Sequence, residues 1–501
     1  MISVLERSRL LLLLMTLVVV FAALFQSELS QRDELGDDDL VFYYNSLALQ
    51  HPVEFDQINK KVSARLGELP LNSNCHCQWE KFRFDLREKF RNNYALYHAS
   101  LGMVRAVVAR YAAAAGVDYP TAVGTSIVAN YYIAFFATVC LLIFILASMV
   151  RGPLIEAVVL AILLMLIIDH LSPYRPGFWE LRVRPSTAKG LFDWFGALVM
   201  LFVSPSSSFV GYFPRALSTL LVMGVFAVRW SGLRNVSYAL LAIVVIIHQG
   251  NGALVLFTLL AIDAALSPEL FRKPAMLACM AVALGAVVLP NGILGQSTGI
   301  SWLLVPFAVL GVGAILLLDF IVERATSKWI VFGRQTRNNF ATRSTVAADM
   351  VIIVLLFGFW AAFSLVMYIR VGQPEGIYTW GDLPARYLML FRAPLFIGVS
   401  ALLLAWTVSH WRRQIVTPII LILAFIAVFT GSTTNDVVRL ALSLRPLDRE
   451  INEIANGKPR VDYYSHAQKD HLEAITYFAI SKQLETGADS ITPLLNLPGK
   501  K

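Results

Sequence analysis

Three consecutive aspartates, Asp37–Asp39, lie shortly after the first apolar segment, in the stretch "SELSQRDELGDDDLVFYYNS". Such a cluster repels itself and gains nothing from a lipid surface, which is usually anionic. A carboxylate at such a place can act as a general base that takes a proton from a hydroxyl group. Neighbouring carboxylates can also hold Mg²⁺ or Mn²⁺ through their oxygen atoms. A solvated loop that caps a helix is the alternative interpretation.

A second group of chemically capable residues lies at the ends of apolar segments. Ionisable groups at such positions cost free energy and usually mark a function or a pairing partner. Arginine, in addition, binds phosphate through two parallel hydrogen bonds. Under the topology given below, this group and the three aspartates share the outer face of a membrane. The members are Asp169, His170, Tyr174, Arg175, Arg182, Arg184, Arg215, His248 and Arg392.

The residues of this group also have simpler interpretations. Arg182 and Arg184 can extend toward lipid headgroups, and the two histidines can be interfacial hydrogen-bonding residues. Asp263 and Asp319 lie near the opposite ends of their segments, beside basic loops, and are expected to form local ion pairs. The arrangement of the group as a whole is therefore more informative than any single member.

The composition indicates which elements must position these residues. Of the 501 residues, 57% are hydrophobic and 15% are charged, whereas soluble domains contain roughly 25% charged residues. The mean hydropathy is +0.63. Apolar stretches of about 16–22 residues recur along the chain and are long enough to cross about 30 Å of hydrocarbon. We therefore expect an all-α, polytopic helical membrane protein.

The apolar stretches predict eleven transmembrane helices. No small-x-small cleavage site follows "VVVFAALFQS", so the first helix is expected to be retained. Asp193 and the break at Pro205 and Ser206–Ser208 predict a re-entrant or interfacial segment near 191–213, which must be sheltered by protein. The predicted spans are 9–26, 127–150, 153–170, 214–229, 236–250, 252–267, 275–290, 300–322, 350–370, 387–409 and 414–431.

The basic residues of the short loops predict the orientation. With the N-terminus in the cytoplasm, inner connections such as "RWSGLRN" and "SHWRRQ" carry Arg, and the outer turns "HQGNG" and "PNGILGQSTG" carry no Arg or Lys. This alternation follows the positive-inside rule and places the C-terminus outside. The net charge of +8 has the same explanation. No basic patch interleaves with aromatic residues, so no nucleic-acid partner is expected.

We expect a transmembrane domain of residues 1–431 and a short extracytoplasmic helical tail of residues 432–501. The outer loop 27–126 contains amphipathic stretches such as "ALYHASLGMVRAVVARYAAAAG", which can lie along the membrane interface. The tail is expected to form one or two polar helices with little capacity for a core. The sequence Cys75–His76–Cys77 offers too few ligands at too short a spacing for a closed zinc site, so no metal ligand is assigned.

The order of these features resembles the GT-C superfamily of integral-membrane glycosyltransferases, of the type that uses a polyprenyl-phosphate-linked sugar. In those enzymes the first outer loop opens with Asp-Asp or Asp-Glu followed shortly by Tyr, and here "DDDLVFYY" fills that place. The strings "SPSSSFVGYFPRALSTLLV" and "IIHQGNGALVLFTLLAIDAAL" are similar to bacterial members. The sequence departs from the pattern in two ways. Many members end in a folded outer domain, whereas the tail here, residues 432–501, is short. Three consecutive acids in place of two also leave open which of them occupies the catalytic position.

The resemblance implies transfer of a sugar from a lipid-phosphate carrier to a glycan, lipid or protein acceptor at the outer face of a bacterial inner membrane. Asp38 or Asp39, with Asp37 as the third candidate, would take the proton of the acceptor hydroxyl. Cationic and polar residues would stabilise the charge on the leaving phosphate, without a cofactor or with Mg²⁺ or Mn²⁺ at the aspartates. These substrate-binding candidates are His170, Tyr174, Arg175, Arg215, His248 and Arg392.

Three other classes stay open. An O-antigen ligase or polymerase type of transferase uses similar substrates but carries its key arginines and histidine in a large later loop. A transporter or flippase needs ionisable residues and broken helices near the bilayer midplane. Acids are scarce there, although Pro306, Pro394 and Pro418 lie within predicted spans. A structural or assembly subunit without chemistry is the third alternative.

Overall fold

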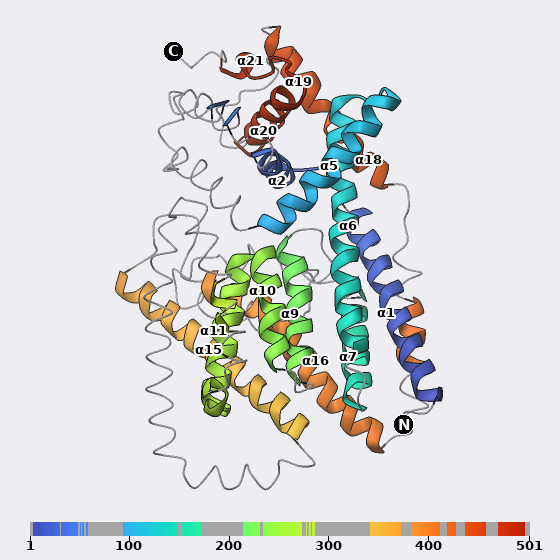
Figure 1. Ribbon diagram of the computed structural model, residues 1–501, viewed down its shortest axis with the longest axis vertical. Helices are drawn as coiled ribbons and strands as arrows, with labels where there is room; N and C mark the ends of the chain where they lie inside the picture. The colour runs from blue at the N-terminus through green and yellow to red at the C-terminus, as the bar shows by residue number, and fades with distance from the viewer. Residues whose placement is uncertain are drawn as a thin grey trace. The chain divides into compact units, whose positions relative to one another are not determined.

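The structure of the protein is a computed structural model, and the residues that it describes are given below. Within these residues all regular structure is helical and no strand occurs, which confirms the predicted all-α class (Figure 1). The described residues are 4–30, 32–48, 94–148, 153–171, 214–230, 234–272, 341–371, 382–410, 418–426, 436–456 and 469–495, with a few positions within 51–58 and 277–285.

The chain divides into two compact units. Unit 1 comprises Met1–Gln26 and Phe136–Ser432, and unit 2 comprises Ser27–Phe135 and Thr433–Lys501. A domain of residues 1–431 that includes the outer loop 27–126 was expected from the sequence, whereas here that loop belongs to unit 2. The association of the tail with the first outer loop in one unit was not predicted, because hydropathy patterns carry no information about which distant segments pack together.

Unit 1 is built from apolar helices. Two of them are divided between the units. Helix α1 (Val4–Ser30) belongs to unit 1 up to Gln26, and α6 (Tyr119–Ser148) belongs to unit 1 from Phe136 onward. The others are α7 (Pro153–Leu171), α9 (Pro214–Trp230), α10 (Arg234–Ile247), α11 (Gln249–Leu266), the short 3₁₀ helix η2 (Pro268–Arg272), α15 (Ala341–Val371) and α16 (Asp382–His410).

Packing in unit 1 joins α9 to α10, α10 to α11, α7 to α16 and α15 to α16. The ring of Phe226 on α9 lies 5.9 Å from that of Phe391 on α16 in an edge-to-face arrangement. Gly398 lets α16 approach its neighbours closely, because a Cβ atom there would lie 2.6 Å from the sulfur of Met350. Small residues at such contacts are typical of helices that pack closely in membranes.

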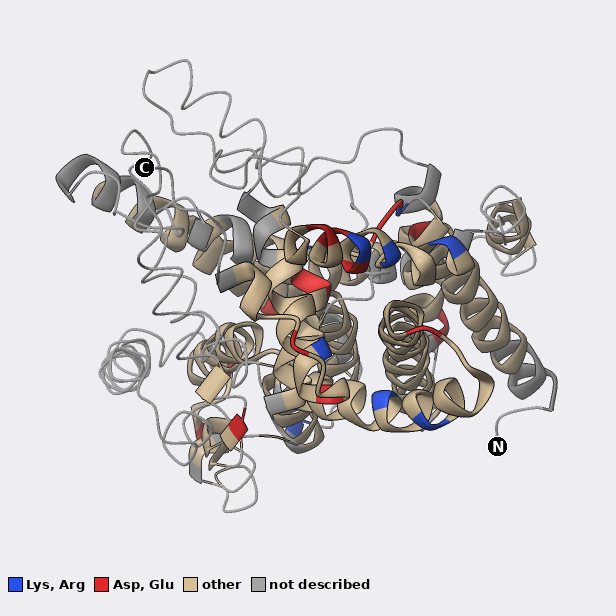
Figure 2. Ribbon diagram, turned by 90° about the horizontal axis from the view of Figure 1, so that it is seen from above, with Lys and Arg blue, Asp and Glu red and all other residues tan. Residues whose placement is uncertain are grey.

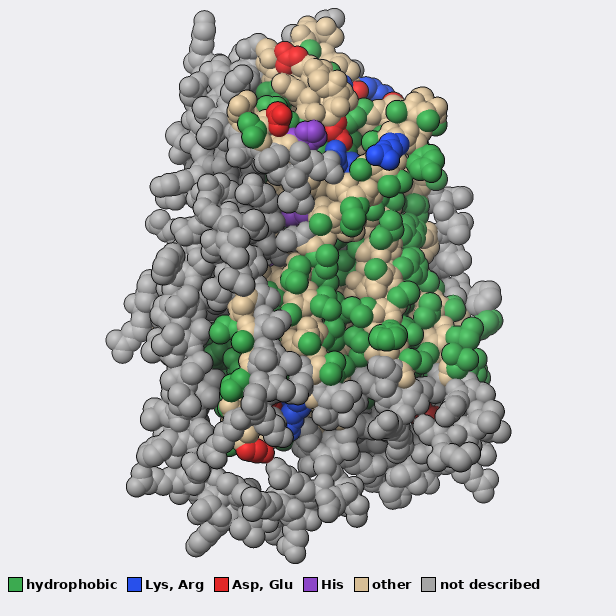
Figure 3. Space-filling model, viewed as in Figure 1, with side chains coloured by type: hydrophobic (Ala, Val, Ile, Leu, Met, Phe, Trp, Pro, Cys, Tyr) green, Lys and Arg blue, Asp and Glu red, His purple; other side chains and the backbone are tan. Residues whose placement is uncertain are grey.

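Four described helices contain a segment that is long and apolar enough to cross a membrane: Leu11–Ser30, Tyr119–Ala147, Gln249–Leu266 and Val346–Phe363. Other helices are apolar but shorter; α10, with 14 residues, is about 21 Å long at 1.5 Å per residue. Few residues of the described helices are charged (Figure 2). On the face shown in Figure 3, hydrophobic side chains cover much of the described surface. The predicted spans 275–290 and 300–322 and the re-entrant segment near 191–213 lie wholly or mostly outside the described residues.

Unit 2 contains the outer-loop helices α2 (Asp37–Ala48) and α5 (Ala95–Ala115) and the first part of α6. The tail adds α18 (Asp436–Leu442), α19 (Arg445–Ala455), α20 (Lys469–Thr486) and α21 (Thr492–Leu495). Helix α2 packs on α5 and α20, and α19 packs on α20 and α21.

The tail is more extensively folded than the one or two polar helices that were predicted. Leu447, Ile451 and Ile454, spaced by four and three residues, are buried on one face of α19, as expected of an amphipathic helix. Phe478 and Ile480 of α20 are fully buried as well. The tail forms a core because it shares one with α2 and α5, a partnership that its own composition does not reveal.

Candidate functional site

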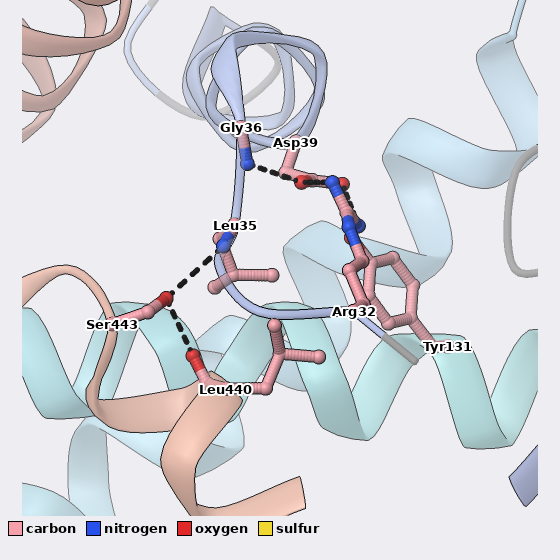
Figure 4. A network of polar contacts seen from close by, with 7 residues as sticks. All are labelled: Arg32, Leu35, Gly36, Asp39, Tyr131, Leu440 and Ser443. Carbon is pink, nitrogen blue, oxygen red and sulfur yellow. Dashed lines mark hydrogen bonds and ion pairs between the residues drawn. The ribbon is translucent and has the colours of Figure 1, made fainter. Parts of the chain in front are cut away.

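A buried ion pair fixes Asp39 at the start of α2 (Figure 4). Helix α1 ends at Ser30, and Arg32 in the following linker directs its guanidinium group at the Asp39 carboxylate. Arg32 Nη1 donates to Oδ1 at 3.1 Å, and Nη2 is paired with Oδ2. The Asp39 side chain is fully buried and that of Arg32 is 17% exposed. The pair has the two-point geometry that makes arginine–carboxylate contacts strong.

Two further donors complete the surroundings of Asp39. The backbone N–H of Gly36 donates to Oδ2 at 2.8 Å, as in a helix capping box. The Tyr131 hydroxyl of α6 donates to Oδ1 and accepts a hydrogen bond of 3.2 Å from Arg32. Each carboxylate oxygen therefore accepts two hydrogen bonds, which fills about four lone-pair positions. A general base needs a lone pair that its substrate can reach, so this geometry favours a positioning role for Asp39.

The other two aspartates lie in the same first turn of α2. Asp38 is exposed, one residue away from the anchored Asp39. Asp37 begins the helix, and its side chain lies outside the described residues. The positive end of the helix dipole favours negative charge in this turn. Because Asp39 is bound to Arg32, Tyr131 and Gly36, the backbone that carries Asp38 is held in a defined place on unit 2.

The tail supports the linker that leads into α2. The backbone N–H of Leu35 donates to Ser443 Oγ at 3.0 Å, and that hydroxyl donates to the carbonyl oxygen of Leu440 at 2.7 Å (Figure 4). Leu440 belongs to α18, so the end of this tail helix positions the linker beside the acidic turn.

A second buried cluster lies one helical turn further along α2. Glu485 of α20 accepts hydrogen bonds at Oε2 from Tyr43 at 2.7 Å and from Tyr119 at 2.8 Å. Its Oε1 is paired with Arg105 of α5, and the two side chains are 12% and 6% exposed. Burial, and then the negative charge of Glu485, raise the pKa of Tyr43 well above 10.0. The cluster joins four helices of unit 2 around one carboxylate.

In unit 1 the structure brings two of the predicted substrate-binding residues near each other. His248 is the N-cap of α11, and its Nδ1 accepts a hydrogen bond of 3.2 Å from the Asn251 N–H. The Asn251 side chain donates to Ser218 Oγ at 2.6 Å, and Ser218 donates to the carbonyl oxygen of Arg215 at 2.7 Å. Arg215 is exposed in the first turn of α9. Two helix N-termini, which favour anions, therefore start beside one arginine and one histidine.

For the remaining predicted site residues the structure describes fewer contacts or no side chain. Arg392 is 2% exposed within α16, two residues before Pro394. Asp169 and His170 lie in the last turn of α7, and their side chains are outside the described residues. Also outside them are Tyr174, Arg175, Arg182, Arg184, Asp319, Cys75 and Cys77.

A buried charge cluster lies at the other ends of the unit 1 helices. Arg229 of α9 contacts Asp349 of α15 through Nε at 2.8 Å and Asp263 of α11 through Nη1 at 2.7 Å, with all three side chains fully buried. Trp230 and Tyr238 donate to the two carboxylates at 3.1 and 2.9 Å. The predicted ion pair of Asp263 is thus present. Asp349 was not predicted to take part.

Several important residues were missed from sequence, above all Arg32, Tyr131, Arg105 and Glu485. One signal was available: α5 carries only two charged residues, both arginines, on an otherwise uncharged helix. An isolated charge on a buried helix face requires a partner. The identity of that partner was not available, since Arg105 and Glu485 lie 380 positions apart.

Among the described residues, no group of three or more His, Cys, Asp or Glu side chains is arranged to hold a metal ion. Comparison of the chain with protein-family models, with curated proteins and with solved structures finds no match. The geometry of the first turn of α2 therefore carries the functional proposal.

Proposed function

We propose that this chain is a membrane glycosyltransferase that moves a sugar from a lipid-phosphate carrier to a glycan, lipid or protein acceptor at the outer face of a membrane. The four apolar segments support a membrane location. The eleven spans, the cytoplasmic N-terminus, the extracytoplasmic C-terminus and the bacterial inner membrane belong to the same proposal.

The anchored first turn of α2 is the observation that carries this proposal. Asp39 is saturated by Arg32, Tyr131 and Gly36, and this holds the exposed Asp38 beside it in a fixed place. A base that is fixed before the substrate binds needs no reorganisation during the reaction. We therefore assign Asp38 as the base and Asp39 as a positioning residue, and Asp37 is the second candidate for the base.

The reaction follows from these roles. The acceptor hydroxyl attacks the anomeric carbon of the sugar, and Asp38 takes the hydroxyl proton. A new bond forms between the acceptor oxygen and that carbon. The bond from the carbon to the phosphate oxygen breaks, and its electron pair leaves with the lipid phosphate. Within unit 1, Arg215, His248 and the N-termini of α9 and α11 stay candidates for binding a phosphate group.

The direct test replaces each acid by its amide in turn and measures sugar transfer from labelled polyprenyl-phosphate sugars by the reconstituted full chain. Asp38→Asn is expected to lower turnover by about 10²–10⁴-fold, the usual contribution of a general base. The control is Asp33→Asn, whose side chain is 86% exposed in an exposed pair with Arg439. Full activity in all three variants at 37–39 would instead favour the O-antigen ligase or polymerase class. Loss of activity with EDTA would assign Mg²⁺ or Mn²⁺ to the site.

One observation favours the transporter class as the second candidate. Arg229, Asp263 and Asp349 are ionisable groups buried within apolar helices, where such groups usually mark a pathway or a relay. However, Arg229 and Asp263 lie in the last turns of α9 and α11, whereas transporter sites lie near the bilayer midplane. The cluster also contains opposite charges in direct contact, so we assign it to holding the helices together.

A further inference from the structure

One face of α5 is apolar and exposed. The exposed fractions are 44% for Leu96, 66% for Met103, 55% for Val107 and 74% for Tyr111. The spacings of seven, four and four residues place these side chains on one side of the helix. We refer to these four residues as the outer face of α5.

The opposite face of α5 is fixed to the rest of unit 2. Tyr97 and Leu101 are buried, and the Tyr97 ring lies 5.2 Å from that of Phe42 on α2. Arg105, on the same side as Leu101, is paired with Glu485 of α20. The opposite face of α5 therefore makes the helix's contacts with the core of unit 2, and the four residues of the outer face lie outside that core.

The charge of α5 is unlike that of a helix surrounded by water. Its only charged residues are Arg105 and Arg110, and it has no acidic residue. Arg105 is buried in its ion pair, so Arg110 is the single exposed charge of the helix. Helices that lie in a membrane interface combine an apolar face with basic residues in this way. Arginine and tyrosine near the end of such a helix can keep the apolar part of their side chains in the hydrocarbon region while their polar tips reach the lipid headgroups.

Helix α6, which follows α5 in the chain, also exposes an apolar side chain next to the contact with α5. Helix α5 ends at Gly116, whose left-handed backbone (φ 66°) stops the helix. Helix α6 follows at Tyr119 and contains the candidate membrane span Tyr119–Ala147. Ser100 lies between Leu96 and Met103 on the same side of α5 and donates to Asn130 of α6 at 2.8 Å, so α5 lies alongside this span. Ile133 of α6 is 51% exposed.

We propose that the outer face of α5 contacts the lipid bilayer. In this arrangement Leu96, Met103 and Val107 lie against acyl chains, and Arg110 and Tyr111 lie at the level of the lipid phosphates. The inference rests on the membrane location in the proposed function and is independent of the transfer chemistry. It extends the sequence-based expectation of an interfacial helix by assigning the face that meets lipid.

The experiment uses the full chain in lipid bilayers, with the four native cysteines replaced and one spin-labelled cysteine introduced at a time. The test positions are Met103→Cys and Val107→Cys. Ile133→Cys is the reference on α6, and Asn452→Cys, at an exposed polar position of α19, is the reference for water. Collision with oxygen, which concentrates in lipid, is compared with collision with a water-soluble nickel chelate.

The expected result is an oxygen-to-nickel ratio at 103 and 107 that matches position 133 and exceeds position 452. A ratio equal to that at 452 overturns the inference. Protection from both reagents also overturns it, because a second copy or another protein then covers the face. A water-like ratio at 133 overturns the membrane location itself, which separates the two failures.

A photoreactive diazirine residue at position 107 gives the same answer in a chain that keeps its native cysteines. Illumination in bilayers is expected to attach a lipid, which mass spectrometry detects. Attachment to another polypeptide, or reaction with water alone, overturns the inference.

Discussion

At the scale of single residues, the structure separates three adjacent aspartates by their surroundings. Asp39 accepts hydrogen bonds from a guanidinium group, a phenol and a backbone N–H, while Asp38 is exposed. The sequence places three identical side chains in a row and offers no basis for this distinction. Their different burial provides it, and it supports the proposal that the two residues have different roles.

Replacing Asp39 by asparagine is expected to destabilise unit 2. The amide cannot neutralise the half-buried Arg32, and its nitrogen would meet the donors that now face a carboxylate. Removing one partner of a buried pair costs about 3–5 kcal/mol. Asp33→Asn, in an exposed pair with Arg439, is expected to cost about 0–1 kcal/mol. Thermal unfolding in detergent measures both, and equal melting temperatures for the two variants would contradict the account.

Tyr43 gives a prediction about alkaline pH. Its pKa is raised in the folded state by burial and by Glu485, so folded protein keeps the proton at a pH where unfolded protein loses it. The unfolded state is therefore favoured as the pH rises above about 10, and stability falls there. In Tyr43→Phe this part of the decline is expected to be absent. Unfolding measured from pH 8 to pH 11 tests this, with Tyr111→Phe as the control for loss of an exposed hydroxyl. Parallel curves for wild type and Tyr43→Phe would contradict it.

At the scale of helices, one glycine permits a close contact between helices and another does not. A Cβ atom at Gly124 of α6 would lie 2.0 Å from the carbonyl oxygen of Ala441 on α18, whereas Gly358 of α15 has no atom within 4 Å. Gly124→Ala is expected to destabilise the chain by about 1–3 kcal/mol, because the two helices must separate. Gly358→Ala is expected to stabilise it by about 0.5–1 kcal/mol through its gain in helix propensity. Melting temperatures that move in the same direction would contradict this assignment.

The Arg229 cluster gives a second prediction at this scale. Arg229→Ala leaves Asp263 and Asp349 buried without their shared cation and is expected to cost about 3–5 kcal/mol. Arg234 lies 3.8 Å from Asp263 and is 22% exposed, so Arg234→Ala is expected to cost less than about 1 kcal/mol. If the cluster were a transport relay, Arg229→Ala would change solute flux while leaving the melting temperature near that of the wild type.

The helices show what a sequence can and cannot reveal. The predicted ranges 153–170 and 214–229 correspond to α7 and α9 within a residue or two, because an apolar run bounded by Pro, Gly or Arg is a local signal. The pairing of Arg32 with Tyr131 links positions 99 apart. Such pairings depend on how helices meet in space, and periodicity gives only the direction of a side chain and not its partner.

At the scale of the whole molecule, the proposal makes a claim about sidedness. The tail, including α19, is expected on the extracytoplasmic side, because the basic residues of the short loops predict a cytoplasmic N-terminus. A single cysteine at Asn452 should react with a membrane-impermeant maleimide added to intact cells, in a chain whose native cysteines are replaced. Labelling of the same position only after the membrane is opened would contradict the proposed topology.

The central claim is that the chain makes a glycosidic bond and does not merely move a lipid across a membrane. The most direct measurement incubates the full chain in proteoliposomes with labelled polyprenyl-phosphate sugars and a lipid and glycan extract that supplies acceptors. The account predicts that the label appears on an acceptor while free lipid phosphate is released, and that Asp38→Asn stops both. Movement of intact donor across the bilayer, with no new product and no effect of Asp38→Asn, would contradict it.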